Sequence, residues 1–585
     1  MLKLLKNLKK IDLLMMAISI VLICGQVYLD LEIPSFMSNI TTLVMTSGTT
    51  GKILLEGLKM LGCALGSAVM AVVVGYFAAK ISASFSMNLR EKIFNNVQKF
   101  SVAEIKGFST ASLITRTTND VTQVQMTIAM GMQVLIKAPI MAIWAIVKIL
   151  GKSWQWSFAT AVAVLFLLIL VVVIMVFAIP KFKRIQTQTD DLNRVSRENL
   201  LGTRVVRAYN AEEYEENRFK KVNDSLTKTH LNVSRIMAIM SPAMSFIMSG
   251  LSLAIYWIGA FLINRASIFS GERIIIFSDM VVFSQYAIQV VMSFIMVCMI
   301  FIILPRATVS AKRINEVLDT KSSIKDGTKS GDGSVKGTVQ FKNVSFKYPD
   351  ADEYVLKNIS FEVGEGETIA FIGSTGSGKS TLINLIPRFY DCTEGEILID
   401  GINIKNYKIS ELNKKIGYVS QKAILFTGTV SSNLKLGTAK IGEIDHDQIK
   451  KAVKIAQGTE FIEKMQNTYD AQITQGGNNL SGGQKQRLSI ARAIARDPEI
   501  FIFDDSFSAL DYKTDLILRK ELMSECKNAT KLIVAQRIGT IKDADKIVVL
   551  SDGEIVGMGK HNDLLKNCEI YKEIALSQLN KEELN

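Results

Sequence analysis

Long apolar stretches dominate the first half of the sequence. Six of them approach or exceed the roughly 20 residues that a helix needs to cross a bilayer, and they lie at 13–33, 53–79, 130–150, 156–180, 237–263 and 274–304. After Pro305 the pattern changes to short segments such as Val339–Phe346, in which apolar and polar residues alternate as in a half-buried strand. The pattern therefore predicts an all-α bundle of six transmembrane helices over 1–305, followed by a C-terminal α/β domain.

The boundaries of these regions follow from local composition. Residues 306–337 are predicted to form a linker, because Lys321–Lys336 is rich in Gly, Ser, Lys and Asp. The α/β domain is expected over 338–578, with a C-terminal tail at 579–585. The first apolar stretch has the length of a signal peptide. No A-x-A-like cleavage site follows it and five more apolar stretches do, so we expect a retained helix.

Basic residues orient the predicted bundle. Four lysines lie in the first ten residues, and the two long connections 80–129 and 181–236 carry many Lys and Arg, whereas the other connections are shorter. By the positive-inside rule, the N-terminus and both long connections lie in the cytoplasm, and six crossings return the α/β domain to that side. This topology largely explains the net charge of +13 and the pI near 9.2, so no nucleic-acid partner is expected.

Overall composition agrees with a membrane protein. Hydrophobic residues make up 48% of the 585 residues and the mean hydropathy is +0.24, which is too apolar for an ordinary soluble protein. The six cysteines are scattered and form no C-x-x-C pair. Neither a disulfide framework nor a zinc site is therefore expected.

The two long connections exceed what a turn between helices requires. Both are predicted to be helices prolonged beyond the membrane, with a short crossing element at each tip, near 108–121 and 199–217. A solvated charged face would explain one such segment alone. Two matched extensions on the same side as the α/β domain indicate instead that the tips dock onto a cytoplasmic domain.

A phosphate-binding loop organises the α/β domain, since it follows the strand-like run Ile369–Ile372 and leads into a helix. The loop and the start of its helix comprise Gly373, Ser374, Thr375, Gly376, Ser377, Gly378, Lys379, Ser380 and Thr381. The glycines let backbone N–H groups point at phosphate oxygens, Lys379 can reach the β and γ phosphates, and the Ser380 hydroxyl can bind Mg²⁺. The helix directs its positive dipole end at the same anion.

Further segments fit the same chemistry. The apolar run Ile500–Phe503 predicts a buried strand that ends in Asp504, which can bind Mg²⁺, and Asp505, which can orient or deprotonate water. Each of the other candidates also has a plainer explanation, such as a capped helix start or a core aromatic. They are Gln421, which can sense the metal or the water; Leu480, Ser481, Gly482, Gly483 and Gln484, which can bind a γ-phosphate; the turn Ser508, Ala509, Leu510 and Asp511; and Tyr348, which can stack on a base.

In this ordered set of motifs the chain resembles the ATP-binding cassette exporters, which combine one six-helix membrane half with one nucleotide-binding domain. The resemblance covers nearly all 585 residues. It implies ATP and Mg²⁺ as cofactors and coupling helices in the two tip segments. It also implies a dimer, because ATP would lie between the phosphate loop of one half and the segment Leu480–Gln484, the signature, of another.

Two positions depart from the family pattern. Exporters usually carry Glu after the metal-binding Asp, where this chain has Asp505, and His at the switch position, where it has Gln536. Loss of a general base slows hydrolysis by roughly 10²–10⁴-fold. The chain therefore looks like the degenerate-site subunit of a bacterial heterodimeric multidrug-type exporter, whose partner half carries Glu and His at these positions. A homodimer in which Asp505 hydrolyses ATP slowly is the alternative.

The sequence defines the substrate less closely. Lys137 and Asp279 are ionisable residues in the apolar layer and are predicted to line a substrate pathway, because such groups usually face a cavity. Lys59 and Lys148 are expected to snorkel to the interface. We expect ATP-driven export of amphipathic or apolar small molecules across a bacterial cytoplasmic membrane. A lipid or peptide exporter, and an ATP-gated channel or regulatory subunit, stay open as alternatives.

Overall fold

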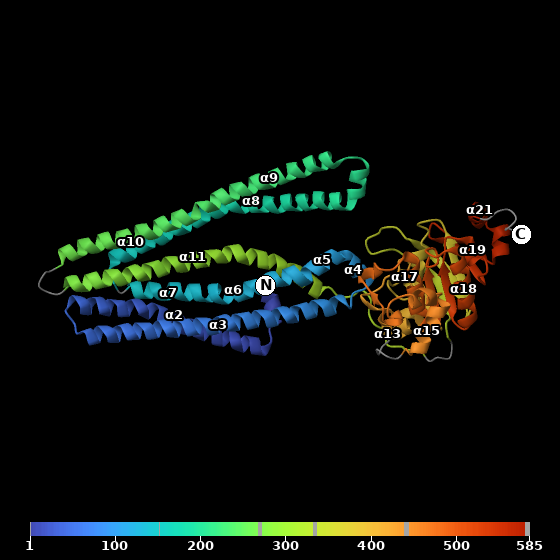
Figure 1. Ribbon diagram of the computed structural model, residues 1–585, viewed down its shortest axis with the longest axis horizontal. Helices are drawn as coiled ribbons and strands as arrows, with labels where there is room; N and C mark the ends of the chain where they lie inside the picture. Colours follow the sequence, from blue (N-terminus) through green and yellow to red (C-terminus); the bar gives the residue numbers. More distant parts are fainter. Residues whose placement is uncertain (1, 151, 267–271, 332–335, 438–443, 579–585) are drawn as a thin grey trace. The chain divides into compact units, whose positions relative to one another are not determined.

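The computed structural model describes the chain except residues 1, 151, 267–271, 332–335, 438–443 and 579–585, and except the side chains of 2, 299–303 and 305. The predicted tail 579–585 and part of the predicted linker lie outside the described residues. The chain divides into two compact units (Figure 1). One comprises Met1–Gln98 with Ala111–Thr320, and the other comprises Lys99–Thr110 with Lys321–Asn585.

The first unit is helical throughout its described elements. These are α1 (Leu2–Leu5), α2 (Lys10–Met45), α3 (Thr50–Val97), α5 (Thr110–Thr115), the π-helix η1 (Arg116–Asp120), α6 (Val121–Gly131), the π-helix η2 (Met132–Ile136), α7 (Lys137–Leu150), α8 (Trp154–Ala208), α9 (Glu212–Ala238), α10 (Met240–Arg265) and α11 (Glu272–Asp319).

Six helical segments in the described residues are long and apolar enough to cross a membrane. They are Lys10–Met45, Thr50–Val97, Thr110–Leu150, Trp154–Ala208, Glu212–Arg265 and Glu272–Cys298. Each overlaps one predicted apolar stretch, so the prediction of six apolar spans is confirmed. The polar connections continue as helix beyond the apolar stretches, since α3 has 48 residues and α8 has 55.

Buried hydrogen bonds join the helices of this unit. Trp156 of α8 donates its indole N–H to the Ile255 carbonyl of α10 at 3.1 Å, and Tyr286 of α11 donates its hydroxyl to the Leu31 carbonyl of α2 at 2.9 Å. A polar group on an aromatic side chain needs such a partner when the surroundings are apolar. These bonds therefore help to define which helices pack together.

The bundle extends further than predicted at its C-terminal end. Helix α11 continues to Asp319, although the bundle was expected to end at 305 and a linker to begin at 306. Ala307, Ala311 and Ile314 recur at helical spacing and are buried, and no Gly or Pro interrupts 306–319. The apolar stripe therefore keeps this segment helical.

The tips of the two extensions differ from each other. The short helix at the first tip is α4 (Val102–Phe108), and it lies in the second unit. Most of the predicted segment 108–121 instead forms α5, η1 and the start of α6. A capping box of Ser101 and Glu104 starts α4 early, with Glu104 accepting from the Ser101 N–H at 2.7 Å. At the second tip, α8 ends at Ala208 and α9 begins at Glu212, within 199–217.

The rest of the second unit is an α/β domain, as predicted. Its strands are β1 (Val339–Phe346), β2 (Leu356–Val363), β3 (Thr368–Gly373), β4 (Glu394–Ile399), β5 (Ile402–Asn403), β6 (Ile416–Val419), β7 (Gly428–Thr429), β8 (Gln472–Ile473), β9 (Ile500–Asp504), β10 (Thr530–Val534), β11 (Lys546–Ser551) and β12 (Glu554–Gly559). Its α-helices are α12 (Lys379–Leu385), α13 (Ile409–Lys415), α14 (Val430–Leu434), α15 (His446–Ile455), α16 (Thr459–Glu463), α17 (Gly482–Ile494), α18 (Tyr512–Glu525), α19 (Ile538–Ile541), α20 (His561–Asn567) and α21 (Glu569–Gln578). The described residues of the domain also form the 3₁₀ turns η3 (Ile404–Asn406), η4 (Thr468–Asp470) and η5 (Gln475–Gly477).

Two sheets carry most of this domain. The larger has the order β12-β11-β3-β10-β9-β6, with β11, β3, β10, β9 and β6 parallel and β12 antiparallel. The smaller is the antiparallel sheet β2-β1-β4-β5, and β7 pairs with β8. The strands β3, β9 and β10 are buried on both faces, and each contains a run of consecutive apolar residues, Ile369–Ile372, Ile500–Phe503 and Leu532–Val534.

Candidate functional site

The parallel strands of the larger sheet end at one edge, and this edge gathers the predicted site. In register, Val534 of β10 pairs with Phe371 of β3 and with Asp504 of β9. The phosphate loop follows β3, Gln421 follows β6, and Gln536 follows β10. Ligands of open α/β sheets bind outside the carboxyl ends of the strands. The fold therefore brings the phosphate loop, Gln421, Asp504 and Gln536 to one edge of the sheet, where a single ligand can contact all of them.

The phosphate loop requires glycine at two places. A Cβ on Gly373 would lie 2.0 Å from the Leu550 carbonyl oxygen, and a Cβ on Gly378, whose φ is +96°, would lie 2.7 Å from a methyl group of Leu356. Only glycine lets the backbone turn this tightly between β3 and α12.

Lys379 lies inside this loop. Its ammonium donates to the carbonyl oxygens of Gly373 at 2.9 Å and Ser374 at 2.6 Å. Burial lowers the pKa of Lys379, whereas the nearby carboxylates of Asp505 and Asp504 favour its charged form. A phosphate oxygen is a stronger acceptor for an ammonium group than a carbonyl is. The lysine is thus placed to bind an anion held by the loop.

Ser380 and Asp504, the predicted metal ligands, are in contact. The Ser380 hydroxyl donates to Asp504 Oδ1 at 2.8 Å. Burial raises the pKa of Asp504, the hydrogen bond from Ser380 opposes this rise, and the charge of Asp505 adds to it. A hydroxyl and a carboxylate beside a phosphate loop are the hard oxygen ligands that Mg²⁺ takes together with substrate phosphates. The residues present therefore fit Mg²⁺.

Two side-chain amides donate to the carboxylate of Asp505. Gln421 and Gln536 each donate from Nε2 to Asp505 Oδ2, and both distances are 3.1 Å. The backbone of Asp505 is left-handed, with a φ of +46°, and its N–H donates to the Val534 carbonyl at 3.0 Å. Such a conformation at a residue other than glycine persists only where the surrounding structure imposes it. The three residues predicted as catalytic thus form one hydrogen-bonded group.

The signature residues Leu480–Gln484 form the start of α17. Ser481 is the N-cap: its hydroxyl accepts from the Gln484 N–H at 3.3 Å, and the Gln484 side chain accepts from the Ser481 N–H at 2.9 Å. Leu480 is buried, whereas Ser481 and Gly482 are exposed. The positive end of the helix dipole is therefore open to an anion from outside this chain.

The turn Ser508–Asp511 connects the carboxylates to this signature helix. Ser508 donates its hydroxyl to the Asp505 carbonyl at 2.8 Å, and a Cβ on Gly483 would lie 3.4 Å from the Ala509 carbonyl oxygen. Asp511 caps α18 by accepting from the Thr514 N–H at 3.0 Å, and this hydrogen bond lowers the pKa of Asp511. The turn therefore lies against both Asp505 and the start of the signature helix.

Two family models match the chain. The model of the ABC transporter transmembrane region matches residues 16–294, and the ABC transporter model matches residues 356–508. An ABC transporter ATP-binding protein of Mycobacterium tuberculosis is 35% identical over 551 residues, which cover 94% of this chain and 93% of the relative. The chain belongs to the ABC transporter family. ATP as a ligand of its nucleotide-binding domain follows from this membership.

Other proteins resemble this ABC transporter over most of their length. An ATP-dependent lipid A-core flippase of Pseudomonas fluorescens is 32% identical over 499 residues, covering 85% of the transporter and 81% of the flippase. The structure of a bacterial Atm1-family ABC exporter with ATP bound matches with a TM-score of 0.80, covering 97% of this chain and 98% of that chain at 23% identity. This likeness shows the fold, one membrane half and one nucleotide-binding domain in a single chain.

Tyr348 of the transporter contacts the helix of the phosphate loop. Its hydroxyl and the Thr381 hydroxyl form a hydrogen bond of 2.9 Å. Its ring lies beside that of Tyr390, with centroids 5.3 Å apart, and the Lys106 ammonium lies 5.1 Å from the Tyr348 ring centroid and 5.7 Å from that of Tyr390. The sequence did not point to Lys106 or Tyr390. The capping-box pattern that starts α4 is the local signal that marks the Lys106 segment.

The four ionisable residues that the sequence placed in or near the apolar layer form ion pairs. Lys137 pairs with Asp30 at 3.2 Å, and Asp279 pairs with Lys152. These partners neutralise both of the residues predicted to line a substrate pathway. The two lysines expected to snorkel also have acidic partners, Glu32 for Lys148 at 2.8 Å and Glu56 for Lys59 at 2.6 Å.

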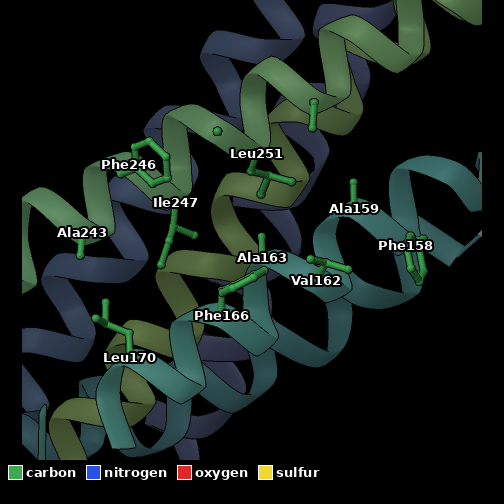
Figure 2. Close-up of a pocket in the computed structure, with 12 residues that line it drawn as sticks. Phe158, Ala159, Val162, Ala163, Phe166, Leu170, Ala243, Phe246, Ile247 and Leu251 are labelled. Carbon is green, nitrogen blue, oxygen red and sulfur yellow. The ribbon is translucent and has the colours of Figure 1, made fainter. Parts of the chain in front are cut away.

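The membrane unit contains an apolar cavity of about 520 Å³ between α8 and α10. Figure 2 shows Ala163 and Phe166 of α8 and Ile247 and Leu251 of α10 pointing toward one another across it. The described residues that line it are all apolar, namely Phe158, Ala159, Val162, Ala163, Phe166, Leu170, Ala243, Phe246, Ile247, Gly250, Leu251 and Ala254. This size lies within the range of small-molecule sites.

Proposed function

We propose that this ABC transporter exports amphipathic or apolar small molecules across the bacterial cytoplasmic membrane as one half of a heterodimer. Its nucleotide-binding domain faces the cytoplasm, as the basic residues of the long connections indicate. ATP is held with little turnover on the phosphate loop of this chain. Hydrolysis takes place at the second site, which the partner half completes.

The observation that carries this proposal is the environment of Asp505. Both amides, from Gln421 and Gln536, donate to the same oxygen of its carboxylate. These two donors occupy the oxygen that would otherwise accept a hydrogen bond from water. Asp505 is also one methylene shorter than the Glu usual in exporters. The site can therefore bind ATP without activating water well.

The other residues of the site take the roles of ATP binding. Lys379 and the backbone of Gly373–Ser380 would hold the phosphates, Tyr348 would stack on the base, and Ser380, Asp504 and the Gln421 side-chain oxygen would hold Mg²⁺. The metal would neutralise phosphate charge when bound. The remaining contacts, through Ser508–Asp511, link the site to the signature helix.

The partner half is needed because each ATP site is composite. Ser481 and Gly482 are exposed at the start of α17, so this signature can bind the γ-phosphate on a partner's phosphate loop. In the heterodimer, Ser481→Arg on this chain should lower ATPase activity by at least tenfold, because it obstructs the site that turns over. Unchanged ATPase activity would show that the signature of this chain does not form part of the site that hydrolyses ATP.

The choice of substrate class rests on the cavity between α8 and α10. It is lined by apolar side chains alone, so it suits the apolar part of an amphipathic molecule (Figure 2). A lipid is the second candidate, because one relative carries the name lipid A-core flippase. Uptake of an amphipathic dye or of a fluorescent lipid into inside-out vesicles, measured against a gradient, separates the two. ATP-dependent movement of neither, with active ATPase, favours a channel or a regulatory subunit.

The tips of the helical extensions would couple ATP binding to transport. The first tip, α4, belongs to the compact unit of the nucleotide-binding domain although the chain on both sides of it belongs to the membrane unit. The second tip exposes Leu200, Leu201 and Tyr209. Exposed apolar side chains of this size are typical of a docking surface.

The deciding experiment measures ATPase activity in lipid nanodiscs, for the chain alone and with a candidate half that carries Glu and His at the altered positions. We expect activity in the pair and little in the chain alone. Substantial activity alone would mean that Asp505 suffices in a homodimer. The degenerate-site proposal would then be abandoned.

A further inference from the structure

The C-terminal helix α21 brings a polar side chain to residues 536–538, here called the switch segment. Tyr571 and Ala575 anchor α21 because both are fully buried in the core of the α/β domain. Gln578 follows Ala575 by three residues and so lies on the same face of the helix. Its Nε2 donates to the Gln536 carbonyl at 2.7 Å, and its Oε1 accepts from the Ile538 N–H at 2.9 Å.

Packing fixes the switch segment at Ile538, which is fully buried in the core. Gln536 and Arg537 are exposed, so packing does not determine their position. Ile538 is the first residue of α19, and the first N–H groups of a helix have no acceptor within the helix. Arg537 provides no side-chain cap for α19. The Gln578 side chain therefore supplies the acceptor that the Ile538 N–H lacks. The same side-chain amide also donates to the Gln536 carbonyl.

We propose that Gln578 is a positioning residue of the ATP site. It brackets residues 536–538 and thereby keeps the Gln536 amide on Asp505 Oδ2. The inference rests on the proposed function, because it takes Asp505 and Gln536 to belong to the ATP site. A displacement of about 1 Å at a catalytic group can cost up to roughly 10²-fold in rate. Release of this bracket thus alters the reaction without removing any group that binds ATP.

Two substitutions separate the two hydrogen bonds. Gln578→Met removes both at nearly constant length, whereas Gln578→Glu keeps an acceptor for the Ile538 N–H and loses the donor to the Gln536 carbonyl. The turnover of this chain's own site is measured in nanodiscs with a partner half whose base carries Glu→Gln, or in the chain alone if the chain alone is active. There we expect Gln578→Met to lower kcat for ATP by about three- to tenfold, with KM changed less than twofold. Hydrogen exchange at the Ile538 amide should accelerate by about tenfold in Gln578→Met and stay slow in Gln578→Glu.

A double-mutant cycle tests whether Gln578 acts through Gln536. Gln536→Ala should lower kcat by a similar factor, and adding Gln578→Met to it should lower kcat no further. Glu573→Met, an exposed position on α21, is the matched control and should leave kcat and the melting temperature unchanged. The proposal is overturned if Gln578→Met leaves kcat unchanged, or if its effect adds fully to that of Gln536→Ala.

A binding measurement keeps this inference distinct from the proposed function. Binding of a fluorescent ATP analogue to the unchanged chain reports on the ATP site as a whole, and its absence would defeat both proposals. Binding with fully additive kinetic effects would defeat the positioning role alone. If Gln578→Met lowers the melting temperature, Gln578→Glu becomes the variant to compare with the unchanged chain. We expect Gln578→Glu to show the same loss of kcat while the Ile538 amide stays protected from exchange. An unchanged kcat in Gln578→Glu would also overturn the proposal.

Discussion

At the scale of single residues, the geometry around Asp505 limits what the ATP site can do. Its carboxylate accepts from the amides of Gln421 and Gln536 at equal distances of 3.1 Å. An amide cannot take up a proton as a histidine can, so Gln536 offers orientation and no acid–base function. We therefore propose that binding and hydrolysis of ATP depend on different side chains of this site.

Restoring both altered residues should restore hydrolysis at this site. The test uses a pair whose partner carries Glu→Gln at its own base, so that the partner's site is inactive. In this pair we expect Asp505→Glu with Gln536→His to raise ATPase activity by about 10–100-fold, because the site then contains a longer carboxylate and an imidazole. Asp505→Asn should give no rise. An ATPase rate unmoved by the double change would show that the site is impaired for another reason.

The buried Asp504 should make the ligand-free protein less stable at neutral pH. Its pKa is raised in the fold, so its contribution to stability is fully present below the pKa of an unfolded Asp and is lost as pH rises through the folded pKa. At pH 7 we expect Asp504→Asn to raise the free energy of unfolding by about 0.5–2 kcal/mol. The gain should shrink at pH 4, and Mg²⁺-dependent ATP binding should be lost.

Denaturant unfolding at the two pH values checks this prediction, with Mg²⁺-dependent binding of an ATP analogue measured on the same samples. A gain in stability that does not depend on pH would contradict the role given to the charge of Asp504.

At the scale of elements, α4 is the piece of the helical extension that packs on the α/β domain. Val102 and Ala103 pack against its apolar cluster, and Lys106 lies over the rings of Tyr348 and Tyr390. Glu104 accepts from the Ser323 N–H at 3.1 Å. Burial alone would raise the pKa of Glu104, but its hydrogen bonds from Ser101 and Ser323 outweigh that and lower it. The helix is thus held by both apolar and polar contacts.

A charge introduced on the face of α4 that packs against the α/β domain should uncouple ATP hydrolysis from transport. We expect Ala103→Asp to lower transport at least tenfold while ATPase activity stays within threefold, because a carboxylate in an apolar contact without a partner costs free energy and displaces the helix. Parallel transport and ATPase assays in the same vesicles check this. Ala103→Ser is the matched control, and equal losses in both assays would contradict a coupling role.

At the scale of the whole molecule, some surfaces make sense only in an assembly. The tip between α8 and α9 exposes Leu200, Leu201 and Tyr209, which are 76%, 83% and 80% exposed. The signature helix likewise presents its N-terminus to the surface. Water is an unfavourable environment for such apolar side chains, so a partner surface is expected to cover them.

A charge at this second tip should weaken the assembly. We expect Leu201→Asp to lower transport by the heterodimer about tenfold or more, whereas Leu201→Met, which keeps an apolar contact, should retain at least half of it. Transport into proteoliposomes, with the yield of copurified partner as a second readout, checks the prediction. Normal transport by Leu201→Asp would show that this tip does not dock.

Much of this fold could be predicted because its signals are local. The six spans are contiguous apolar stretches, and the phosphate loop is one strand–loop–helix segment whose glycines and lysine are adjacent in sequence. The predicted ends were less accurate. Helix α11 runs to Asp319 and α4 starts at Val102, because a buried stripe and a capping box determine these boundaries.

The sequence by itself determined the six apolar spans, the α/β domain and the position of the phosphate loop, since each depends on hydrophobic period or on neighbouring residues. Only the tertiary structure decided which distant side chains meet. It places Gln421 and Gln536 on one oxygen of Asp505, Lys106 over Tyr348, and Gln578 across the switch segment. Such contacts follow from strand order and helix packing, because the parallel sheet aligns strand ends that lie far apart in the chain.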